Sequence, residues 1–356
     1  MEQKSVLIGM SGGVDSSVAA ALLKEQGYHV IGATMRLWTY SDSCNMKHEG
    51  CCAESAVEDA RRVCDKLGID FYVMNFKDMF KDKVVDYFVD EYIHGRTPNP
   101  CIACNKYLKF DALLKKALAM GIDYVATGHY AKIEKGEDGK YILRASEAVK
   151  KDQSYVLYNF TQEQLAHTLM PLGGYNKDWV RQKAEELGLG VAHKPDSQEI
   201  CFVEDDDYAK FITDYSGYKP KEGDILDVNG NVIGEHRGLI YYTIGQRKGI
   251  GAYGRPMFVM KIDAENNTIT LGEKGMEFSN ELTASDVNFV SGEFPKENML
   301  ITAKVRYQAP PAAAMLCPQK DGTVKLMFPE PQRAVTPGQA VVFYDGDIVL
   351  GGGTVL

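Results

Sequence analysis

Cysteines stand in two segments where a thiol could act as a nucleophile. Residues 97–105 read TPNPCIACN, so Cys101 and Cys104 come just before a helix that we expect to begin near residue 105. The positive end of a helix dipole lowers the pKa of a nearby thiol and raises its thiolate fraction. Residues 195–202 read PDSQEICF and place Cys201 in a polar loop, where core packing explains a cysteine poorly. A nucleophile, half a zinc site and a redox pair all remain open for the Cys-x-x-Cys.

A third segment has the composition of a phosphate-binding loop. Residues 5–24 run from an apolar strand through SGGVDSS into an apolar helix. The glycines let the backbone approach a ligand, the helix N-terminus attracts an anion, and Asp15 could reach a Mg²⁺ ion held by the phosphates. Walker A and Gly-x-Gly-x-x-Gly patterns are absent, and an ordinary strand–helix connection is the simpler alternative. The loop resembles the SGGxDS loop of the N-type ATP pyrophosphatases, which implies that the chain uses ATP with Mg²⁺.

The composition argues against several classes of protein. The chain has 356 residues, enough for two or three domains, and its net charge of −9 argues against a generally basic nucleic-acid binder. Its eight cysteines do not form the pattern of a secreted disulfide framework. No N-terminal stretch resembles a signal peptide, and no apolar run approaches the roughly 18 residues of a membrane span. We therefore expect a cytoplasmic protein without membrane segments.

Strand and helix patterns alternate over the first part of the chain. Apolar runs at 5–10, 29–35, 71–76 and 123–127 predict buried parallel strands, with helical patterns near 14–25, 53–67, 77–93 and 106–120. This alternation predicts an α/β domain with a doubly wound, mainly parallel sheet over residues 1–205. Frequent turn signals and short alternating strands then predict two small, mainly β domains, a central one over 206–280 and a barrel-like one over 281–356.

Six motifs occur together in one order along nearly the whole chain. They are SGGVDSS, NPCIACN, ATGHYA at 126–131, KDQSY at 151–155, PDSQEICF and RYQ at 306–308. In this combination the sequence resembles the tRNA-specific 2-thiouridylase family (MnmA). The resemblance implies a PP-loop ATPase fold and ATP-dependent thiolation of uridine at C2, at wobble position 34 of tRNA. It also implies that the last domain contacts tRNA, that Lys, Glu and Gln acceptors are substrates, and that a cysteine desulfurase or a sulfur-relay protein supplies sulfur.

The resemblance further implies roles for individual residues. AMP transfer to the C2 oxygen would make it a good leaving group, Cys201 would carry the sulfur as a persulfide, and Cys104 would attack it. A Cys104–Cys201 disulfide would close, so each turnover would need a reductant. The implied ATP ligands are Gly9, Met10, Ser11, Gly12, Gly13, Val14, Asp15, Ser16, Met35 and Gly128. The implied target-base contacts are Asn99, Pro100 and Cys101, and those to the rest of the tRNA are His129, Lys151, Asp152, Gln153, Tyr307, Gln308 and Gln339.

One position departs from the family pattern. Some members carry Asp where this chain has Cys101, and a thiol is a poorer general acid or base near neutral pH. The general acid/base is therefore unassigned. The change also gives the site three thiols, Cys101, Cys104 and Cys201, which could hold an iron–sulfur cluster that binds sulfide. A cluster is thus the alternative to the persulfide.

The remaining signals leave other interpretations open. Cys44, His48, Cys51 and Cys52 form a separate group whose spacing matches no standard zinc signature, and we expect Cys64 and Cys317 to be structural. Basic residues between 132 and 151 predict local positive charge for RNA, or only a solvated hairpin. Two rival functions are a PP-loop synthetase or sulfurtransferase acting on a small molecule, and a non-catalytic RNA-binding or redox-sensing protein. A monomer is sufficient, because one chain holds every motif.

Overall fold

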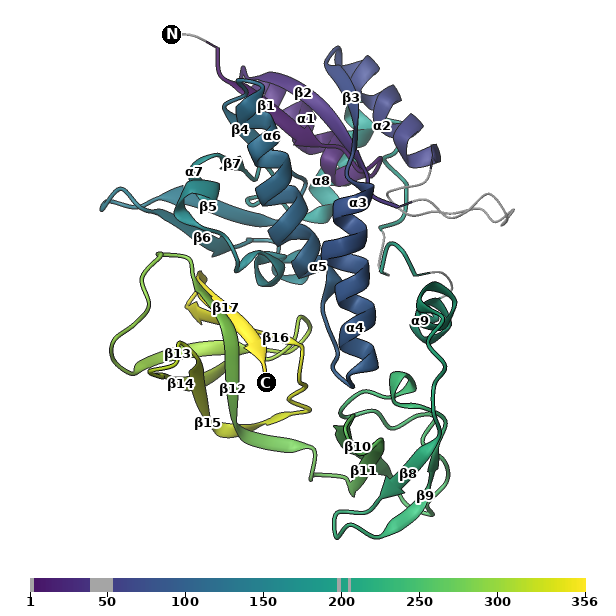
Figure 1. The fold of residues 1–356 in the computed structure, drawn as a ribbon. Coiled ribbons are helices and arrows are strands. Elements are labelled where there is room, and N and C mark those ends of the chain that lie inside the picture. The colour runs from purple at the N-terminus through teal and green to yellow at the C-terminus, as the bar shows by residue number, and fades with distance from the viewer. Residues whose placement is uncertain (1–2, 39–53, 197–199, 204–205) are drawn as a thin grey trace.

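The computed structural model describes residues 3–38, 54–196, 200–203 and 206–356 (Figure 1). The predicted group of Cys44, His48, Cys51 and Cys52 lies outside the described residues. No helix among the described residues is long and apolar enough to cross a membrane.

The N-terminal part of the chain forms a five-stranded parallel sheet in the order β3-β2-β1-β4-β7. Its strands are β1 (Ser5–Gly9), β2 (His29–Arg36), β3 (Asp70–Asn75), β4 (Tyr124–Ala126) and β7 (Thr168–Leu169). β1 is central, and Val6, Leu7 and Ile8 have no exposed surface, as expected for a strand covered on both faces. The predicted α/β sheet is confirmed. Because β1 and β4 pair in parallel, the loops that follow them lie side by side at one edge.

Helices cover both faces of this sheet (Figure 1). One face is covered by α1 (Val14–Glu25), α2 (Glu54–Leu67) and α8 (Lys177–Glu186). Two longer helical stretches pack on the other face, and each contains a π-helical part. They consist of α3 (Lys77–Phe80), η1 (Lys81–Asp86) and α4 (Tyr87–Ile93), and of α5 (Pro100–Ala103), η2 (Cys104–Ala112) and α6 (Leu113–Ala119).

The second of these stretches begins earlier than the sequence predicts. The side-chain oxygen of Asn99 accepts hydrogen bonds from the N–H groups of Cys101 (3.1 Å) and Ile102 (3.4 Å). Pro100 occupies the first helical position, where no N–H is needed. Cys101 therefore lies in the first turn and Cys104 at the start of the π-helical part. The expected start near residue 105 was wrong, because Asn99 followed by Pro100 is itself a helix-start signal.

Two small β units follow, as predicted. The central one is a four-stranded sheet in the order β10-β11-β8-β9, built from β8 (Gly223–Leu226), β9 (Val232–His236), β10 (Met257–Asp263) and β11 (Thr268–Glu273). The last one has the order β12-β15-β14-β13-β16-β17, and pairing of β12 with β17 closes it into a barrel. Its strands are β12 (Phe278–Phe289), β13 (Met299–Lys304), β14 (Ala312–Pro318), β15 (Val324–Arg333), β16 (Ala340–Asp345) and β17 (Ile348–Val355). Closure leaves this barrel without a free strand edge.

A basic hairpin joins the first unit to the barrel. Its strands, β5 (Ala131–Lys135) and β6 (Tyr141–Ala145), extend the barrel sheet through Arg144 opposite Ile348. Lys132 pairs with Glu147, Lys140 with Glu293, and Arg144 with Glu134 and Asp347. The hairpin therefore offers less uncompensated positive charge than its sequence predicts.

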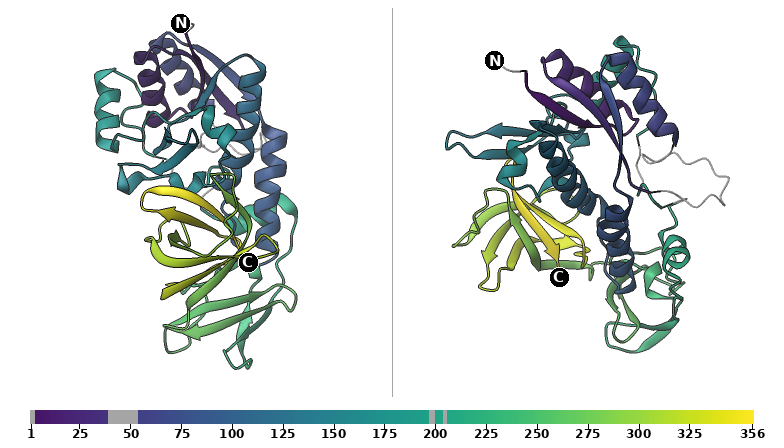
Figure 2. Two further views of the ribbon diagram at one scale, coloured as in Figure 1. Left: turned by 90° about the vertical axis from the view of Figure 1, so that its left-hand side faces the viewer. Right: turned by 45° about the horizontal axis from the view of Figure 1, so that its top comes forward.

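Short elements and aromatic contacts complete the connections between the units. The remaining elements are η3 (Val149–Lys151), η4 (Ser154–Leu157), α7 (Gln162–Ala166), α9 (Tyr208–Ser216) and η5 (Leu239–Tyr241). At the end of α4, Tyr92 stacks on Tyr208 with ring centroids 4.7 Å apart. The Tyr155 hydroxyl donates to the carbonyl of Ala340 in the barrel (2.6 Å). Both views of Figure 2 show the barrel and the central unit below the parallel sheet.

Candidate active site

The phosphate loop joins β1 to α1 in a conformation that requires glycine. Gly12 has a φ of +70°, and a Cβ there would lie 2.3 Å from the carbonyl oxygen of Ala56. Gly13 is the N-cap of α1 and has no side chain to cap the first-turn N–H groups. The hydroxyls of Ser16 and Ser17 donate to the Gly13 carbonyl (3.3 and 2.8 Å) and close the turn. This geometry suits an anion bound at the helix N-terminus.

The Asp15 carboxylate in this loop is held by side chains from distant parts of the chain. The Nζ of Lys177 donates to both carboxylate oxygens (2.8 and 2.7 Å), and the Tyr130 hydroxyl donates to Oδ1 (2.6 Å). Burial and then the negative charge of Asp15 raise the pKa of Tyr130 far above its usual value, so the hydroxyl remains a donor. The Lys177 side chain is only 12 % exposed. A Mg²⁺ ion that arrives with ATP would therefore compete with Lys177 for Asp15.

Asp196 extends the network to the segment that bears Cys201. Its carboxylate accepts from Lys177 (2.6 Å), Lys151 (2.7 Å) and Arg181 (3.3 Å). Burial alone would raise the pKa of Asp196, but hydrogen bonds from Lys151 and Lys177 outweigh it and hold this pKa below its usual value. The network thus joins the phosphate loop, the KDQSY segment and the PDSQEICF segment.

Replacing Lys177 with methionine should slow the ATP-dependent step by about 10- to 100-fold, because Asp15 and Asp196 then face the triphosphate with one cation fewer. The rate of pyrophosphate release at several ATP concentrations measures this effect. Lys183 provides the matched control, since it lies on the same helix and pairs with the half-exposed Glu25 (2.9 Å). Lys183→Met should change the rate by less than about twofold. Equal rates in the two variants would contradict the expectation.

The three cysteines of the predicted site differ in exposure. Cys104 is 8 % exposed and belongs to the same core cluster as Phe202, whereas Cys101 and Cys201 are exposed. The Phe202 ring packs on Phe80 (5.6 Å) and on Phe88 (5.3 Å), so this aromatic anchor follows Cys201 directly in the chain. The helix that carries Cys104 and the segment that carries Cys201 therefore pack on one core.

The alternative of an iron–sulfur cluster is not supported by the arrangement of these thiols. Within the described residues, no group of three or more His, Cys, Asp and Glu side chains is close enough together to hold a metal ion. Cys101, Cys104 and Cys201 thus do not fit a cluster in this conformation.

Two predicted tRNA contacts, Tyr307 and Gln339, also hold the barrel to the first unit. The Tyr307 hydroxyl donates to the backbone carbonyl of Asp152 (3.1 Å), and the Gln339 amide donates to that of Thr97 (3.0 Å). Gln308, next to Tyr307, is exposed. The charge of Cys101 contributes to raising the pKa of Tyr307, after burial and Asp152. The predicted target-base segment therefore lies near Tyr307, although residue 101 and residue 307 belong to different units.

His129, another predicted tRNA contact, is half-buried and hydrogen-bonded inside the first unit. Its Nδ1 lies 2.7 Å from the Thr127 hydroxyl, and its ring packs near Phe110 (5.8 Å). Burial and then the charge of Lys109 lower the pKa of His129 well below 6.5. The imidazole is therefore neutral at pH 7.

Because the folded state binds this proton more weakly than the unfolded chain, His129 should destabilise the protein as the pH falls below about 6.5, by up to ~1.4 kcal/mol per pH unit. The free energy of unfolding in urea at pH 7.5 and 5.5 measures this loss. His129→Gln should reduce the loss. The same pH dependence in wild type and His129→Gln would contradict the assignment.

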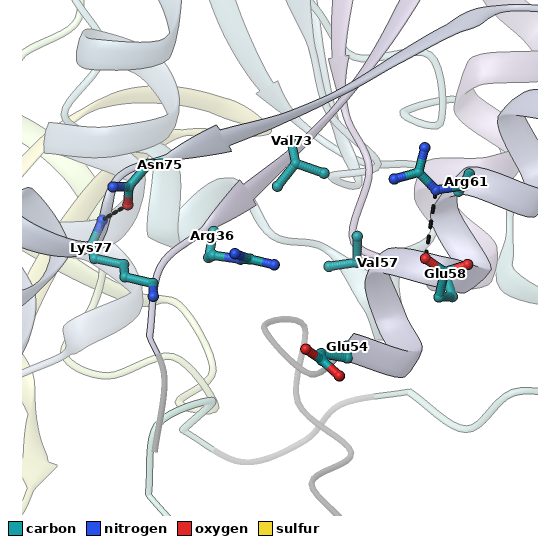
Figure 3. A pocket seen from close by; sticks show the side chains of 8 residues that line it. All are labelled: Arg36, Glu54, Val57, Glu58, Arg61, Val73, Asn75 and Lys77. Atoms are coloured by element: carbon teal, nitrogen blue, oxygen red, sulfur yellow. Dashed lines mark hydrogen bonds and ion pairs between the residues drawn. The ribbon is translucent and has the colours of Figure 1, made fainter. Parts of the chain in front are cut away.

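A polar cavity of about 550 Å³ opens at the carboxyl ends of β2 and β3 (Figure 3). Its lining residues are Arg36, Glu54, Val57, Glu58, Arg61, Val73, Asn75 and Lys77. Met35, a predicted ATP ligand, precedes Arg36 on β2, but its side chain packs against the core on the opposite face of the sheet. A nucleotide contact by Met35 would therefore use its backbone.

Sequence reasoning missed two residues that the structure places beside the phosphate loop. Tyr130 lies inside the ATGHYA motif, and its position directly after His129, a predicted site residue, could have pointed to it. Lys177 lies in a stretch without a motif, so no signal in the chain pointed to it.

Comparison with known proteins covers the whole chain. Family models match as "tRNA methyl transferase HUP domain" over residues 4–205, "tRNA methyl transferase PRC-barrel domain" over 209–273 and "Aminomethyltransferase beta-barrel domain" over 279–355. The chain is 58% identical to a tRNA-specific 2-thiouridylase MnmA of Acetivibrio thermocellus over 100% of both chains. It is also 58% identical to one of Clostridioides difficile, over 99% of this chain and 98% of the relative. Among solved structures, a 4-thiouridine synthetase in complex with RNA and ATP matches 56% of this chain and 45% of its own, with 18% identity and a TM-score of 0.37.

Proposed function

Because the chain belongs to the tRNA-specific 2-thiouridylase family, we propose that it thiolates the wobble uridine, position 34, of tRNA at C2 through a persulfide on Cys201. The observation that carries this proposal is the Lys177 network. One ammonium group contacts both Asp15 of the phosphate loop and Asp196, five positions before Cys201. An enzyme that must couple ATP cleavage to sulfur transfer needs these two segments together.

The first step activates the base. The C2 oxygen of uracil attacks the α-phosphorus of ATP, N3 loses its proton, and pyrophosphate leaves. The turn at Gly12 and Gly13 and the first-turn N–H groups of α1 would hold the phosphates, with Mg²⁺ accompanying ATP as part of the substrate. The remaining proposed ATP ligands are Gly9, Met10, Ser11, Val14, Ser16, Met35 and Gly128.

The second step transfers sulfur. The Cys104 thiolate attacks the Cys201 sulfur that bears the persulfide, a Cys104–Cys201 bond forms, and the outer sulfur leaves as hydrosulfide. Hydrosulfide adds to C2, AMP leaves with the former C2 oxygen, and one proton returns to N3 to give 2-thiouridine. A thiol reductant then supplies two electrons to reopen the disulfide.

The tRNA would approach the seam between the first unit and the barrel. We propose Asn99, Pro100 and Cys101 as contacts to the target base. His129, Lys151, Asp152, Gln153, Tyr307, Gln308 and Gln339 are the proposed contacts to the rest of the tRNA. The substrates would be Lys, Glu and Gln acceptors, and a cysteine desulfurase or a relay protein would load Cys201. We expect a cytoplasmic monomer.

Nucleoside mass spectrometry of unmodified tRNA tests the function. The reaction contains the protein, ATP-Mg, a cysteine desulfurase, cysteine and a thiol reductant, and 2-thiouridine, AMP and pyrophosphate should form in equal amounts. A small-molecule synthetase, the rival function, would consume ATP without modifying tRNA. A folded, ATP-binding protein that forms no 2-thiouridine would overturn the proposal.

A further inference from the structure

Asn105, the residue after Cys104, has a buried side-chain amide whose nitrogen is hydrogen-bonded and whose oxygen, among the described residues, is not. Asn105 is 3 % exposed, and Nδ2 of its side chain donates to the carbonyl of Val156 (3.0 Å). In the described part of the chain, Oδ1 of Asn105 has no hydrogen-bond partner. A buried acceptor without a donor destabilises the fold, so its position beside Cys104, the proposed nucleophile, points to a donor on a ligand.

The position of Asn105 in the helix brings it toward the proposed target base. Cys101, Cys104 and Asn105 are three and four positions apart and so share one face of the helical stretch. That face is turned to η4, which begins within the KDQSY segment, since Asn105 donates to Val156 in η4. Cys101, on the same face, lies near Tyr307, whose hydroxyl reaches Asp152 of that segment. Asn105 is thus the buried end of a face whose exposed end is Cys101.

Uracil and cytosine differ in the hydrogen-bonding character of N3, which a buried acceptor can distinguish. N3 of uracil carries a hydrogen and donates, whereas N3 of neutral cytosine is an acceptor. An amide oxygen is an acceptor only, so it can accept a hydrogen bond from N3–H of uracil but is repelled by the lone pair on N3 of cytosine. A site built around a buried acceptor rejects a ligand that lacks the matching donor.

We propose that Oδ1 of Asn105 accepts a hydrogen bond from N3–H of the target base and thereby selects uridine over cytidine. This inference rests on the proposed function. The contact acts before activation, because N3 loses its proton when the C2 oxygen receives AMP. Asn105 is therefore a specificity residue whose effect lies in tRNA binding and KM rather than in kcat.

The test compares dissociation constants of two tRNA transcripts that differ only in U34 or C34, measured without ATP. Wild type should prefer U34 by about 10-fold or more. Asn105→Leu keeps a similar side-chain volume but has no acceptor. For this variant the ratio of the C34 and U34 dissociation constants should fall to about one. Loss of the hydrogen bond to Val156 would weaken the binding of both transcripts equally and would leave the ratio of their dissociation constants unchanged. An unchanged ratio in Asn105→Leu would overturn the inference.

A matched variant and a modified base keep the result interpretable. Asn288 has a half-buried side-chain amide on β12 of the barrel that donates to the carbonyls of Tyr158 (2.7 Å) and Phe160 (3.1 Å), so Asn288→Leu should lower stability and keep the wild-type ratio. If Asn105→Leu does not fold, wild type is tested with 3-methyluridine at position 34, where binding as tight as that of uridine would overturn the inference. Wild-type thiolation of the U34 transcript is measured in parallel. If the U34 transcript is not thiolated, the proposed function is wrong. If thiolation is normal but Asn105→Leu keeps the wild-type ratio of dissociation constants, only the role of Asn105 is refuted.

Discussion

Cys104→Ser and Cys201→Ser should each lower the rate of 2-thiouridine formation by about 1,000-fold or more, because sulfur transfer needs one thiol to carry the sulfur and a second to release it. Both variants should still release pyrophosphate and accumulate adenylated tRNA, since the phosphate loop is untouched. Nucleoside mass spectrometry measures the first effect, and a pyrophosphate assay of a single turnover measures the second.

Cys317→Ser is the matched control for these variants. Cys317 is a half-buried thiol of β14 in the barrel, and its replacement should leave thiolation within about twofold of wild type. Full thiolation by Cys201→Ser would contradict the persulfide route. Loss of pyrophosphate release in both cysteine variants would instead mean that the thiols act in the ATP step.

Gly128→Ala should lower the affinity for ATP by roughly 5- to 150-fold, the equivalent of about 1–3 kcal/mol of overpacking. A Cβ at Gly128 would lie 2.7 Å from the amide nitrogen of Ser16 and 2.8 Å from the carbonyl carbon of Asp15. Both atoms belong to the first turn of α1, so the methyl group can be accommodated only by moving the phosphate loop. Equilibrium binding of ATP-Mg measures the change.

Gly174→Ala separates this local effect from a general loss of stability. Apart from its two chain neighbours, no described residue has a heavy atom within 4 Å of a Cβ built at Gly174, so this variant should bind ATP as the wild type does. Melting temperatures of both variants show whether either is unfolded. ATP binding by Gly128→Ala at the wild-type affinity would mean that the two loops at the ends of β1 and β4 adjust to each other freely.

The phosphate loop and the buried parallel strands of the first unit could be predicted from local signals. Gly12 adopts a positive φ, which glycine favours, and the apolar runs around β1 and β4 indicate buried parallel strands. The start of the helix at Asn99 was missed, because its capping oxygen and the following proline were obscured by a second proline at position 98. The charge that the basic hairpin leaves uncompensated could not be predicted, since the acidic partners of Lys140 and Arg144, Glu293 and Asp347, lie in the barrel or next to it in the chain.

The sequence by itself determined where the reactive groups stand along the chain and which backbone turns they can adopt. Glycine freedom, strand periodicity and helix capping are properties of a few neighbouring residues, and they act in any context. Tertiary structure alone decided which charges meet: Lys177 reaches Asp15 from 162 positions away, in a stretch without a motif. It also decided that Asn105 is buried with one end unmatched. Burial and long-range charge depend on how whole elements pack, and no local pattern encodes that packing.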